Sequence, residues 1–371
     1  MATIKGTDQS ENLPGTFGND EIWGAGGDDI IQGGWGDDIL YGEAGNDYLA
    51  GEAGDDTMYG GDGADTIVFM EGDAAFGGDG DDYFECDTDG YAGATVDGGE
   101  GFDTVDLTRA MDNTIIYLDD APGSGFRISN IELLRVGYTS SIYGGSRNDR
   151  IEAGSAPQTG SDFHGGGGDD ALFGYLYSDT LYGDAGDDLI DGGHGNDLLE
   201  GGAGEDKLIG GGGDDTLNGG LGDDIVLGGE GWDTLVLSGM RDDYRVLRSG
   251  DDFIIKGVDG LDRVSGVELL RFSDGTVVDL ARQFGAGSDE SAGDDAFVLP
   301  PRPDDPPQVL PAAGADKFAG EPLVLPGAVD AGGRMFAGLE ARLDHMGGWA
   351  PTLHLDNGLG DEFGRPGDWP F

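Results

Sequence analysis

The sequence is poor in basic residues, in cysteine and in long apolar runs. Its 19 Lys and Arg residues stand against 75 Asp and Glu residues, which gives a formal net charge of −56. Such a charge repels phosphate groups and so excludes nucleic acids and anionic membrane surfaces as electrostatic partners. The single cysteine, Cys86, cannot form an intrachain disulfide, and we expect it to be a buried, idle thiol. No apolar run approaches transmembrane length.

Signals for export and for catalysis are also missing. The N-terminal residues MATIKGTDQSENL contain no apolar segment of the Sec type, so we expect a cytoplasmic protein or an export route encoded elsewhere in the chain. There is no HExxH motif of zinc proteases and no GxSxG motif of lipases. Pairs of acidic residues could mimic a glycosidase dyad, but metal binding explains them equally well. We therefore expect that the protein is not an enzyme.

Glycine and aspartate, in contrast, are abundant and strictly spaced. Eight nine-residue units fill the interval from Gly165 to Val236 without a slip, for example GGHGNDLLE from Gly192. Position six is always Asp, position eight is always aliphatic, and position four is Gly in seven of the eight units. A fixed short period indicates a solenoid, and this one has the form of a calcium-binding nonapeptide repeat.

The same frame begins near the N-terminus. Seven units run from Gly6 to Val68, and the first is degenerate, as expected of a terminal repeat. Single units start at Gly77 and at Gly98. GGEGFDTVDL followed by ISNIELLRV recurs later as GGEGWDTLVL followed by VSGVELLRF, which indicates an internal duplication.

Each unit predicts a glycine turn and a short strand of about three residues with one inward apolar side chain. Two units then make one coil of 18 residues, so turns two units apart stack at about 4.8 Å. Carboxylates stacked at that spacing would repel by several kcal/mol per coil, at about 4 kcal/mol for a pair in a medium of intermediate dielectric. Oxygen ligands in a flexible backbone suit Ca²⁺ better than Mg²⁺, and no Cys or His recurs at zinc-ligand spacing. A disordered tract would not keep position eight aliphatic, and the GxGxxG-like strings lack the following helix of a nucleotide site.

The expected fold is all-β: a parallel, right-handed β-roll in two arrays, each followed by a β-rich insert or cap, and then a Pro-rich tail. The expected divisions are a first roll over 1–85, a β-rich insert with degenerate repeats over 86–164, a second roll over 165–236, a cap over 237–280 and a tail over 281–371. Eleven of the 14 prolines lie in that tail, which favours extended linker. Three VLP strings and one candidate helix, around 333–346, stand out within it.

The repeats resemble those of the RTX (repeats-in-toxin, hemolysin-type calcium-binding) family. This resemblance implies a parallel β-roll in which position-six aspartates and turn carbonyls hold several Ca²⁺ ions. It also implies type I secretion through a C-terminal signal, and hence an extracellular protein, free or retained at the cell surface. The units containing Asp149 and Asp179 lack the glycine pattern, which leaves their sites in doubt. The implied ligands are Asp20, Asp29, Asp38, Asp47, Asp56, Asp65, Asp82, Asp103, Asp170, Asp188, Asp197, Asp206, Asp215, Asp224 and Asp233.

Two functions fit these features. The first is a secreted protein that folds on binding calcium outside the cell and has a structural, surface or matrix-binding role. The alternative is a non-catalytic accessory or targeting partner of an exported enzyme or toxin, which docks through the C-terminal tail. The protein or glycan partner is not identified by the sequence.

Overall fold

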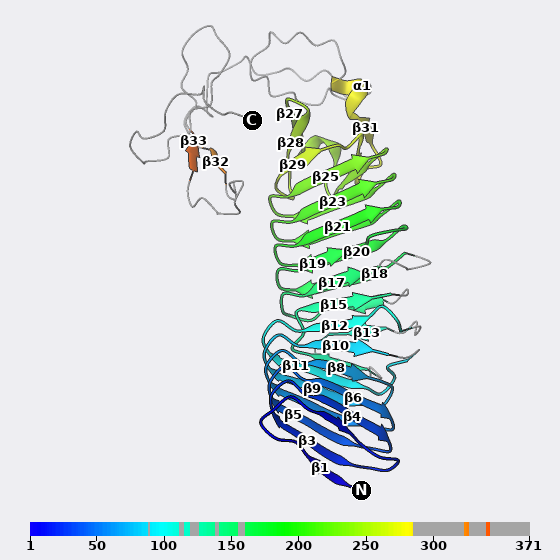
Figure 1. The fold of residues 1–371 in the computed structure, drawn as a ribbon. Helices are drawn as coiled ribbons and strands as arrows, with labels where there is room; N and C mark the ends of the chain where they lie inside the picture. The colour runs from blue at the N-terminus through cyan, green and yellow to red at the C-terminus, as the bar shows by residue number, and fades with distance from the viewer. Residues whose placement is uncertain are drawn as a thin grey trace, which may run out of the picture. The chain divides into compact units, whose positions relative to one another are not determined.

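The computed structural model describes residues 1–87, 90–110, 115–118, 126–137, 141–154 and 160–284, together with residues 323–325 and 339–341. The chain divides into two compact units, Met1–Pro300 and Pro301–Phe371. The first unit holds all the repeats and is a parallel β-solenoid (Figure 1). Its described residues include one short 3-10 helix, Arg241–Asp243, and one short α-helix, α1 (Leu280–Phe284).

Each nine-residue unit contains the end of one strand, one turn and the start of the next strand. A strand begins at position seven and ends at position three of the next unit, as in β21 (Leu189–His194) and β22 (Leu198–Ala203). The strands are therefore six residues long, not three as expected, because pairing with the next coil continues to position three of the next unit, although the glycine at position two has a positive φ, 90° at Gly193. The turn needs glycine at position four, where Gly195 has a φ of 142° that residues with a Cβ rarely adopt.

The 18-residue coil predicted from the sequence is confirmed by the strand register. Strand β20 (Thr180–Ala185) pairs in parallel with β22, and Leu181 lies opposite Leu199, 18 residues further along. The same step joins β21 to β23 (Lys207–Gly212). Successive coils therefore stack with equivalent positions in contact.

Three sheets run along the solenoid, and all their pairings are parallel except at the C-terminal end. The seven-stranded sheet contains β1 (Thr3–Lys5), β3 (Glu21–Gly26), β5 (Ile39–Ala44), β7 (Thr57–Asp62), β9 (Ala74–Asp79), β11 (Thr95–Glu100) and β14 (Arg127–Ser129). The 15-stranded sheet contains β2 (Asn12–Pro14), β4 (Ile30–Trp35), β6 (Tyr48–Ala53), β8 (Thr66–Phe69), β10 (Tyr83–Cys86), β12 (Thr104–Leu107), β15 (Leu133–Val136), β17 (Arg150–Ala153), β19 (Ala171–Phe173), β21, β23, β25 (Ile225–Glu230), β29 (Leu261–Ser265), β28 (Asp252–Lys256) and β27 (Arg245–Ser249). The nine-stranded sheet contains β13 (Ile116–Tyr117), β16 (Ser141–Tyr143), β18 (Asp162–Gly167), β20, β22, β24 (Thr216–Leu221), β26 (Thr234–Leu237), β30 (Leu269–Phe272) and β31 (Val277–Asp279).

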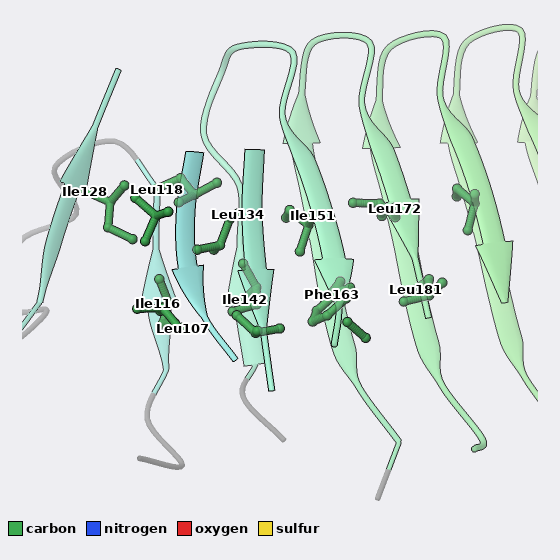
Figure 2. Packing of buried hydrophobic residues seen from close by; sticks show 14 of the residues in the cluster. Leu107, Ile116, Leu118, Ile128, Leu134, Ile142, Ile151, Phe163, Leu172 and Leu181 are labelled. Atoms are coloured by element: carbon green, nitrogen blue, oxygen red, sulfur yellow. The ribbon is translucent and has the colours of Figure 1, made fainter. Parts of the chain in front are cut away.

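The core of the regular repeats is a row of side chains from position eight, whereas strands outside the regular repeats, such as β10 with Phe84 and Cys86, bury more than one. Ile142, Ile151, Phe163, Leu172 and Leu181 are fully buried and follow one another along the inside of the coils (Figure 2). The aliphatic residues at position eight of the repeats are buried in the same way, as the sequence predicts. Cys86 is also buried, as expected.

The interval 86–164, expected to be a β-rich insert, continues the solenoid. Strand β15 pairs with both β12 and β17, so the long sheet passes through this interval without a break. On the opposite face β14 follows β11, and the bridge between Leu118 and Ile128 joins it to the β13 segment. Because β13 precedes β14 in the chain, the strands here stack out of sequence order (Figure 2). One face thus passes from the seven-stranded to the nine-stranded sheet.

The segment 237–280 extends the last coils and folds back on them. Strands β27 and β28 form an antiparallel hairpin, and β28 pairs antiparallel with β29, which itself pairs in parallel with β25. Strand β30 pairs with β26, and β31 returns antiparallel after a turn at Asp274 and Gly275. Val246, Ile255 and Val264 are fully buried, so the hairpin lengthens the core.

Aromatic rings form a ladder on the outer face of the seven-stranded sheet. The ring centroids of Trp23 and Tyr41 are 4.1 Å apart, those of Tyr41 and Tyr59 are 5.1 Å apart, and those of Tyr59 and Phe76 are 5.0 Å apart. All four residues hold position nine of successive coils or its equivalent. The ladder is therefore a direct consequence of the 18-residue stacking.

The second unit contributes one two-stranded antiparallel sheet, β32 (Leu323–Leu325) with β33 (Leu339–Ala341). Strand β32 is the third VLP string of the sequence. Strand β33 lies where a helix was expected, and that expectation is wrong for Leu339–Ala341, because pairing with β32 supplies the backbone hydrogen bonds that a helix would otherwise provide. The rest of 333–346 and the other two VLP strings lie outside the described residues. Within the described residues of the whole chain, no helix is long and apolar enough to cross a membrane.

Candidate metal sites

The position-six aspartates form columns along the edges of the solenoid, one carboxylate per coil. Every predicted ligand is buried, and none exposes more than 2% of its surface. Each one directly precedes the first residue of a strand, so the strand register fixes its place in the column. The columns are those predicted from the 18-residue coil.

One carboxylate oxygen of each aspartate holds the coils together. The backbone N–H of Asp179 donates to Oδ1 of Asp197 at 2.8 Å, that of Asp197 donates to Oδ1 of Asp215 at 2.8 Å, and that of Asp215 donates to Oδ1 of Asp233 at 2.9 Å. The same bond links Asp29 to Asp47 in the first array, at 2.7 Å. Oδ1 therefore has a structural role in the column.

The second oxygen, Oδ2, has no such partner. In most of the column it is buried and accepts no hydrogen bond from any residue that the structure describes. An ionised carboxylate in that state is strongly destabilising unless a cation accompanies it. The residues with such an oxygen are Asp29, Asp38, Asp47, Asp56, Asp65, Asp82, Asp103, Asp170, Asp179, Asp188, Asp197, Asp206, Asp215, Asp224 and Asp233.

The unpartnered oxygens face a space that the glycines keep open. A Cβ on Gly24 would lie 2.5 Å from Oδ2 of Asp29 and 2.7 Å from the carbonyl oxygen of Gly42, one coil further on. Carboxylate and carbonyl oxygens therefore face the same small volume, and both are ligands that Ca²⁺ prefers. Within the described residues, no three His, Cys, Asp or Glu side chains converge as a metal cluster. A bound cation would thus need main-chain carbonyls as well as side chains.

The electrostatics of the columns show the cost of leaving them without a cation. Burial and, to a smaller extent, the charges of neighbouring aspartates raise the pKa of Asp56, Asp82, Asp170 and Asp206 to about 7. The charged form of these groups is therefore disfavoured in the folded coil unless positive charge is supplied.

Three aspartates in the columns differ from the rest because their Oδ2 atoms accept hydrogen bonds. Oδ2 of Asp20 accepts the N–H and the hydroxyl of Thr16, both at 2.7 Å, and the hydroxyl bond is the main cause that lowers the pKa of Asp20. Oδ2 of Asp73 accepts the N–H of Met70 at 2.8 Å. Oδ2 of Asp149 accepts the N–H of Gly145 at 2.9 Å. These carboxylates are less available to a cation than the others.

The glycine pattern alone understates the site at Asp179. Its unit, GYLYSDTLY, has Tyr175 and Tyr177 where glycine is usual, yet both residues adopt positive φ values, 76° and 75°. The turn differs from the glycine turns, since φ at position four is 142° at Gly195 and strand β19 already ends at Phe173, yet Asp179 is buried with an unpartnered Oδ2 like its neighbours.

A further unit at 257–265, GVDGLDRVS, was not recognised in the sequence. The N–H of Asp224 donates to Oδ1 of Asp262 at 3.3 Å, so Asp262 takes the position-six place in the column. Gly260, at position four, has a φ of 155°. The unit is separated from its neighbour by the β27–β28 hairpin, so the column steps 38 residues in place of 18. The sequence does contain a signal for this unit: Gly at positions one and four, Asp at position six and Val at position eight.

Two glutamates replace aspartate where the columns change. Oε2 of Glu132 accepts the N–H of Asp103 at 2.8 Å, and Oε2 of Glu268 accepts the N–H of Asp233 at 2.8 Å. Both belong to the duplicated ELLR segments, in which the glycine turn is cut short. These positions keep the hydrogen bond of the column but lose the turn that frames the open space.

The fold and these turns define a class: a parallel β-solenoid whose glycine turns stack buried carboxylates that need an oxygen-preferring cation. The model of the RTX calcium-binding nonapeptide repeat (4 copies) matches residues 6–40, 14–49, 32–67, 41–74, 164–199 and 200–235. The chain therefore carries RTX calcium-binding nonapeptide repeats within residues 6–74 and 164–235, and these repeats form a calcium-binding β-roll. The comparison with curated proteins gave no match.

Proposed function

We propose that the protein is exported and folds outside the cell as a non-catalytic, calcium-loaded rod with a structural or binding role at the cell surface or in the matrix. The observation that carries the proposal is the stack of buried, unpartnered Oδ2 atoms. A chain with a formal charge of −56 gains little from folding where calcium is scarce, because each coil would bury another uncompensated carboxylate.

The residues that would hold the ions are the aspartates with an unpartnered Oδ2, which include Asp179, together with turn carbonyls such as that of Gly42. Calcium would supply the positive charge between stacked turns. Because these ligands are brought together only by the coil, the free energy of ion binding becomes free energy of folding.

The test is a calcium titration of the full chain followed by far-UV circular dichroism, with magnesium as the comparison ion. We expect a largely unfolded chain at submicromolar calcium and a β-rich spectrum at millimolar calcium. Identical spectra in chelator and in calcium would refute calcium-dependent folding. Export is tested separately, by measuring the protein in the culture medium of its own cells.

A further inference from the structure

The capping segment carries a group of positive side chains on the outer face of the 15-stranded sheet. Strands β29, β28 and β27 follow β25 at the end of this sheet (Figure 1). Arg245 of β27 lies directly opposite Lys256 of β28, and Arg263 of β29 lies directly opposite Ile254 of β28. Because side chains alternate along a strand, Ile254 and Lys256 point to the same side of the sheet. We call Arg245, Lys256 and Arg263, which are all exposed, the cationic face.

The other side of the same strands belongs to the core, which fixes the direction of the cationic face. The sequence neighbours of the three cations, Val246, Ile255 and Val264, are fully buried. The cations therefore cannot turn inward without exposing this core. Between Cβ atoms, directly opposite positions lie about 5 Å apart and diagonal positions about 7–8 Å apart. Because Lys and Arg side chains are long, their charged ends can converge on one small anionic group.

This arrangement is unfavourable for the fold by itself. Like charges at directly opposite positions of an antiparallel pair destabilise a sheet. Earlier along the same sheet, Arg135 and Arg150 both pair with Glu152, at 3.2 and 2.5 Å. Within the part of the chain that the structure describes, the side chains of the cationic face make no such ion pair and no hydrogen bond. In a chain with 75 acidic and 19 basic residues, neighbouring cations without a carboxylate require a reason other than the stability of the roll.

The surroundings of the cationic face leave it a local positive charge. Ile225 and Leu261, which lie opposite Arg263 and Lys256 in the strand register, are apolar and each 39% exposed. Two carboxylates border the face. Asp223 accepts the N–H of Leu261 at 2.9 Å. Asp252 lies four residues from Lys256 on β28, which is about 13 Å along an extended strand. The three cations therefore outnumber the bordering carboxylates.

The chemistry of the cationic face suits a sulfate or phosphate ester better than a carboxylate. The planar guanidinium group of arginine binds two oxygens of one anion at once, and the ammonium group of lysine adds a third donor direction. A group with three free oxygens can satisfy donors from three sides, whereas a carboxylate has only two oxygens. An acidic peptide strand added at the free edge of β27 would lie beside Arg245, but about 10 Å farther from Arg263, two strands inward.

The net charge of −56 decides how such an ester can be presented to the protein. A plane of anionic lipids would also approach the acidic turns and be repelled by them. A flexible polymer can contact the cationic face alone. At an ionic strength of 0.15 M the screening length is about 8 Å, so acidic turns farther away than this repel the polymer only weakly.

We propose that the cationic face binds an anionic polysaccharide through its sulfate or phosphate esters and attaches the capped end of the roll to a surface or matrix. This inference rests on the proposed surface or matrix role, for which it names the class of partner. The bound ester neutralises the repulsion between Arg245 and Lys256. Binding therefore stabilises the β27–β28 hairpin.

The experiment measures the binding of dextran sulfate to the full, calcium-loaded chain by isothermal titration calorimetry. Uncharged dextran of the same length is the control polymer, and we expect it not to bind. The affinity for dextran sulfate should be highest near 0.15 M salt. At 0.01 M the screening length grows to about 30 Å, so the whole negative chain repels the polymer, and at 1 M the direct contacts are screened as well.

Substitutions test the three cations one by one. Lys256→Gln and Arg263→Gln should each weaken binding about threefold, the effect of losing an exposed ion pair. The triple variant, in which Arg245→Gln is added to these two, should bind about thirtyfold more weakly. Lys256→Arg keeps the charge and should bind as the wild type does. The matched control is Arg271→Gln, which removes an exposed cation from β30 of the nine-stranded sheet and should leave the affinity unchanged.

Hydrogen–deuterium exchange of peptides from the hairpin, 245–256, separates binding from a structural role. Without polymer, protection of the hairpin in Lys256→Gln should equal or exceed that of the wild type, because a like-charge pair is removed. With dextran sulfate, the wild-type hairpin should gain protection and the triple variant should not. A loss of protection in Lys256→Gln without polymer would show that the lysine serves the fold and would contradict the proposal.

The remaining outcomes are also decisive. If the chain folds with calcium but does not bind dextran sulfate, this inference is wrong and the proposed calcium-dependent folding stands. Unchanged binding by the triple variant would assign the contact to calcium bridges between acidic groups, against the proposal. Tighter binding of poly-glutamate than of dextran sulfate would make an acidic protein the partner. A chain that does not fold with calcium would refute the proposed function, and this inference with it.

Discussion

Glu268 ends a column of aspartates by accepting the backbone N–H of Asp233 through Oε2, at 2.8 Å. Glu132 makes the same contact with Asp103, at 2.8 Å, in the first half of the chain. The longer side chain of glutamate reaches the N–H although the glycine turn of the repeat has been shortened. The duplication visible in the sequence thus repeats a specific hydrogen bond. The column ends at Glu268, whereas after Glu132 the same sheet continues through β17, which Asp149 directly precedes.

This contact predicts a difference between two substitutions of Glu268. Glu268→Ala leaves the N–H of Asp233 without an acceptor and should lower the free energy of unfolding by about 1–3 kcal/mol, the cost of an unpaired polar group. Glu268→Gln keeps an acceptor oxygen and should lose less than half of that. Urea unfolding at saturating calcium measures both. Equal losses would show that the charge, and not the hydrogen bond, is what matters.

Within a column, a central aspartate should matter more than a terminal one. Asp197 has aspartate neighbours on both sides, Asp179 and Asp215, whereas Asp233 is followed by Glu268. Asp197→Asn should therefore raise the calcium midpoint for folding more than Asp233→Asn does.

The matched control for this comparison is Asp223→Asn, at position five. Oδ1 of Asp223 is exposed and accepts the N–H of Leu261 at 2.9 Å, a bond that asparagine can keep. We expect little shift of the calcium midpoint. A shift as large as that of Asp197→Asn would mean that position six is not the ligand column.

The sequence pattern suggests a calcium site at Asp20 and leaves the one at Asp179 in doubt, whereas the structure predicts that Asp179 contributes more to calcium binding than Asp20. Oδ2 of Asp179 is unpartnered, whereas Oδ2 of Asp20 is already bonded to Thr16. Asp179→Asn should raise the calcium midpoint by about as much as Asp197→Asn, and Asp20→Asn should raise it less. The titration is read by circular dichroism. The reverse order would show that regular glycine spacing, and not the free oxygen, defines a site.

The calcium-free chain should be more ordered in mild acid. Burial raises the pKa of Asp170 and Asp206 to about 7 in the folded coil, well above the value of about 3.9 expected in the unfolded chain. The folded state therefore binds more protons between these values, and its stability falls as the pH rises from about 4 to about 7.

In calcium-depleted buffer, far-UV spectra at pH 5 should then show more β-structure than spectra at pH 8. With calcium present the direction reverses, because protons compete with the ion for the carboxylates, and the calcium midpoint should rise on acidification. A calcium-free spectrum that does not change between pH 5 and pH 8 would contradict the raised pKa values.

Export predicts a separate result for the C-terminal tail. If the tail carries the secretion signal that the family resemblance implies, a chain without its last ~60 residues should stay inside the cell while its repeats still respond to calcium. Immunoblots of cells and medium measure the first property, and circular dichroism of the purified chain measures the second. Equal amounts of both chains in the medium would place the signal elsewhere.

The regular part of the fold follows from the sequence because each position has one physical role. An aliphatic residue at position eight fixes the inward face, and glycine at position four fixes the turn, so both the coil length and the columns could be predicted. Strand length could not be predicted, since glycines at positions one and two are typical of turns but here are part of the paired strand, as in β21. The change from the seven-stranded to the nine-stranded sheet at Ile128 depends on a contact with Leu118 that the repeat pattern does not predict.

The missed site residues share one cause. Asp179 follows two tyrosines that accept a backbone conformation normally left to glycine, and Asp262 follows a hairpin inserted within a coil. In both cases the structure keeps a turn whose sequence pattern is interrupted. The partners of Glu132 and Glu268 lie 29 and 35 residues away, a separation that only the assembled coil brings together.

The aromatic ladder gives the first array a spectroscopic signal of its own. Trp23, Tyr41, Tyr59 and Phe76 are spaced closely enough for their electronic transitions to couple, with centroids 4.1–5.1 Å apart. A slip of one residue in any coil would turn its ring from the outer face to the interior and break the series. The near-ultraviolet dichroism of these rings therefore reports whether neighbouring coils are in register, a property that secondary-structure content alone does not reveal.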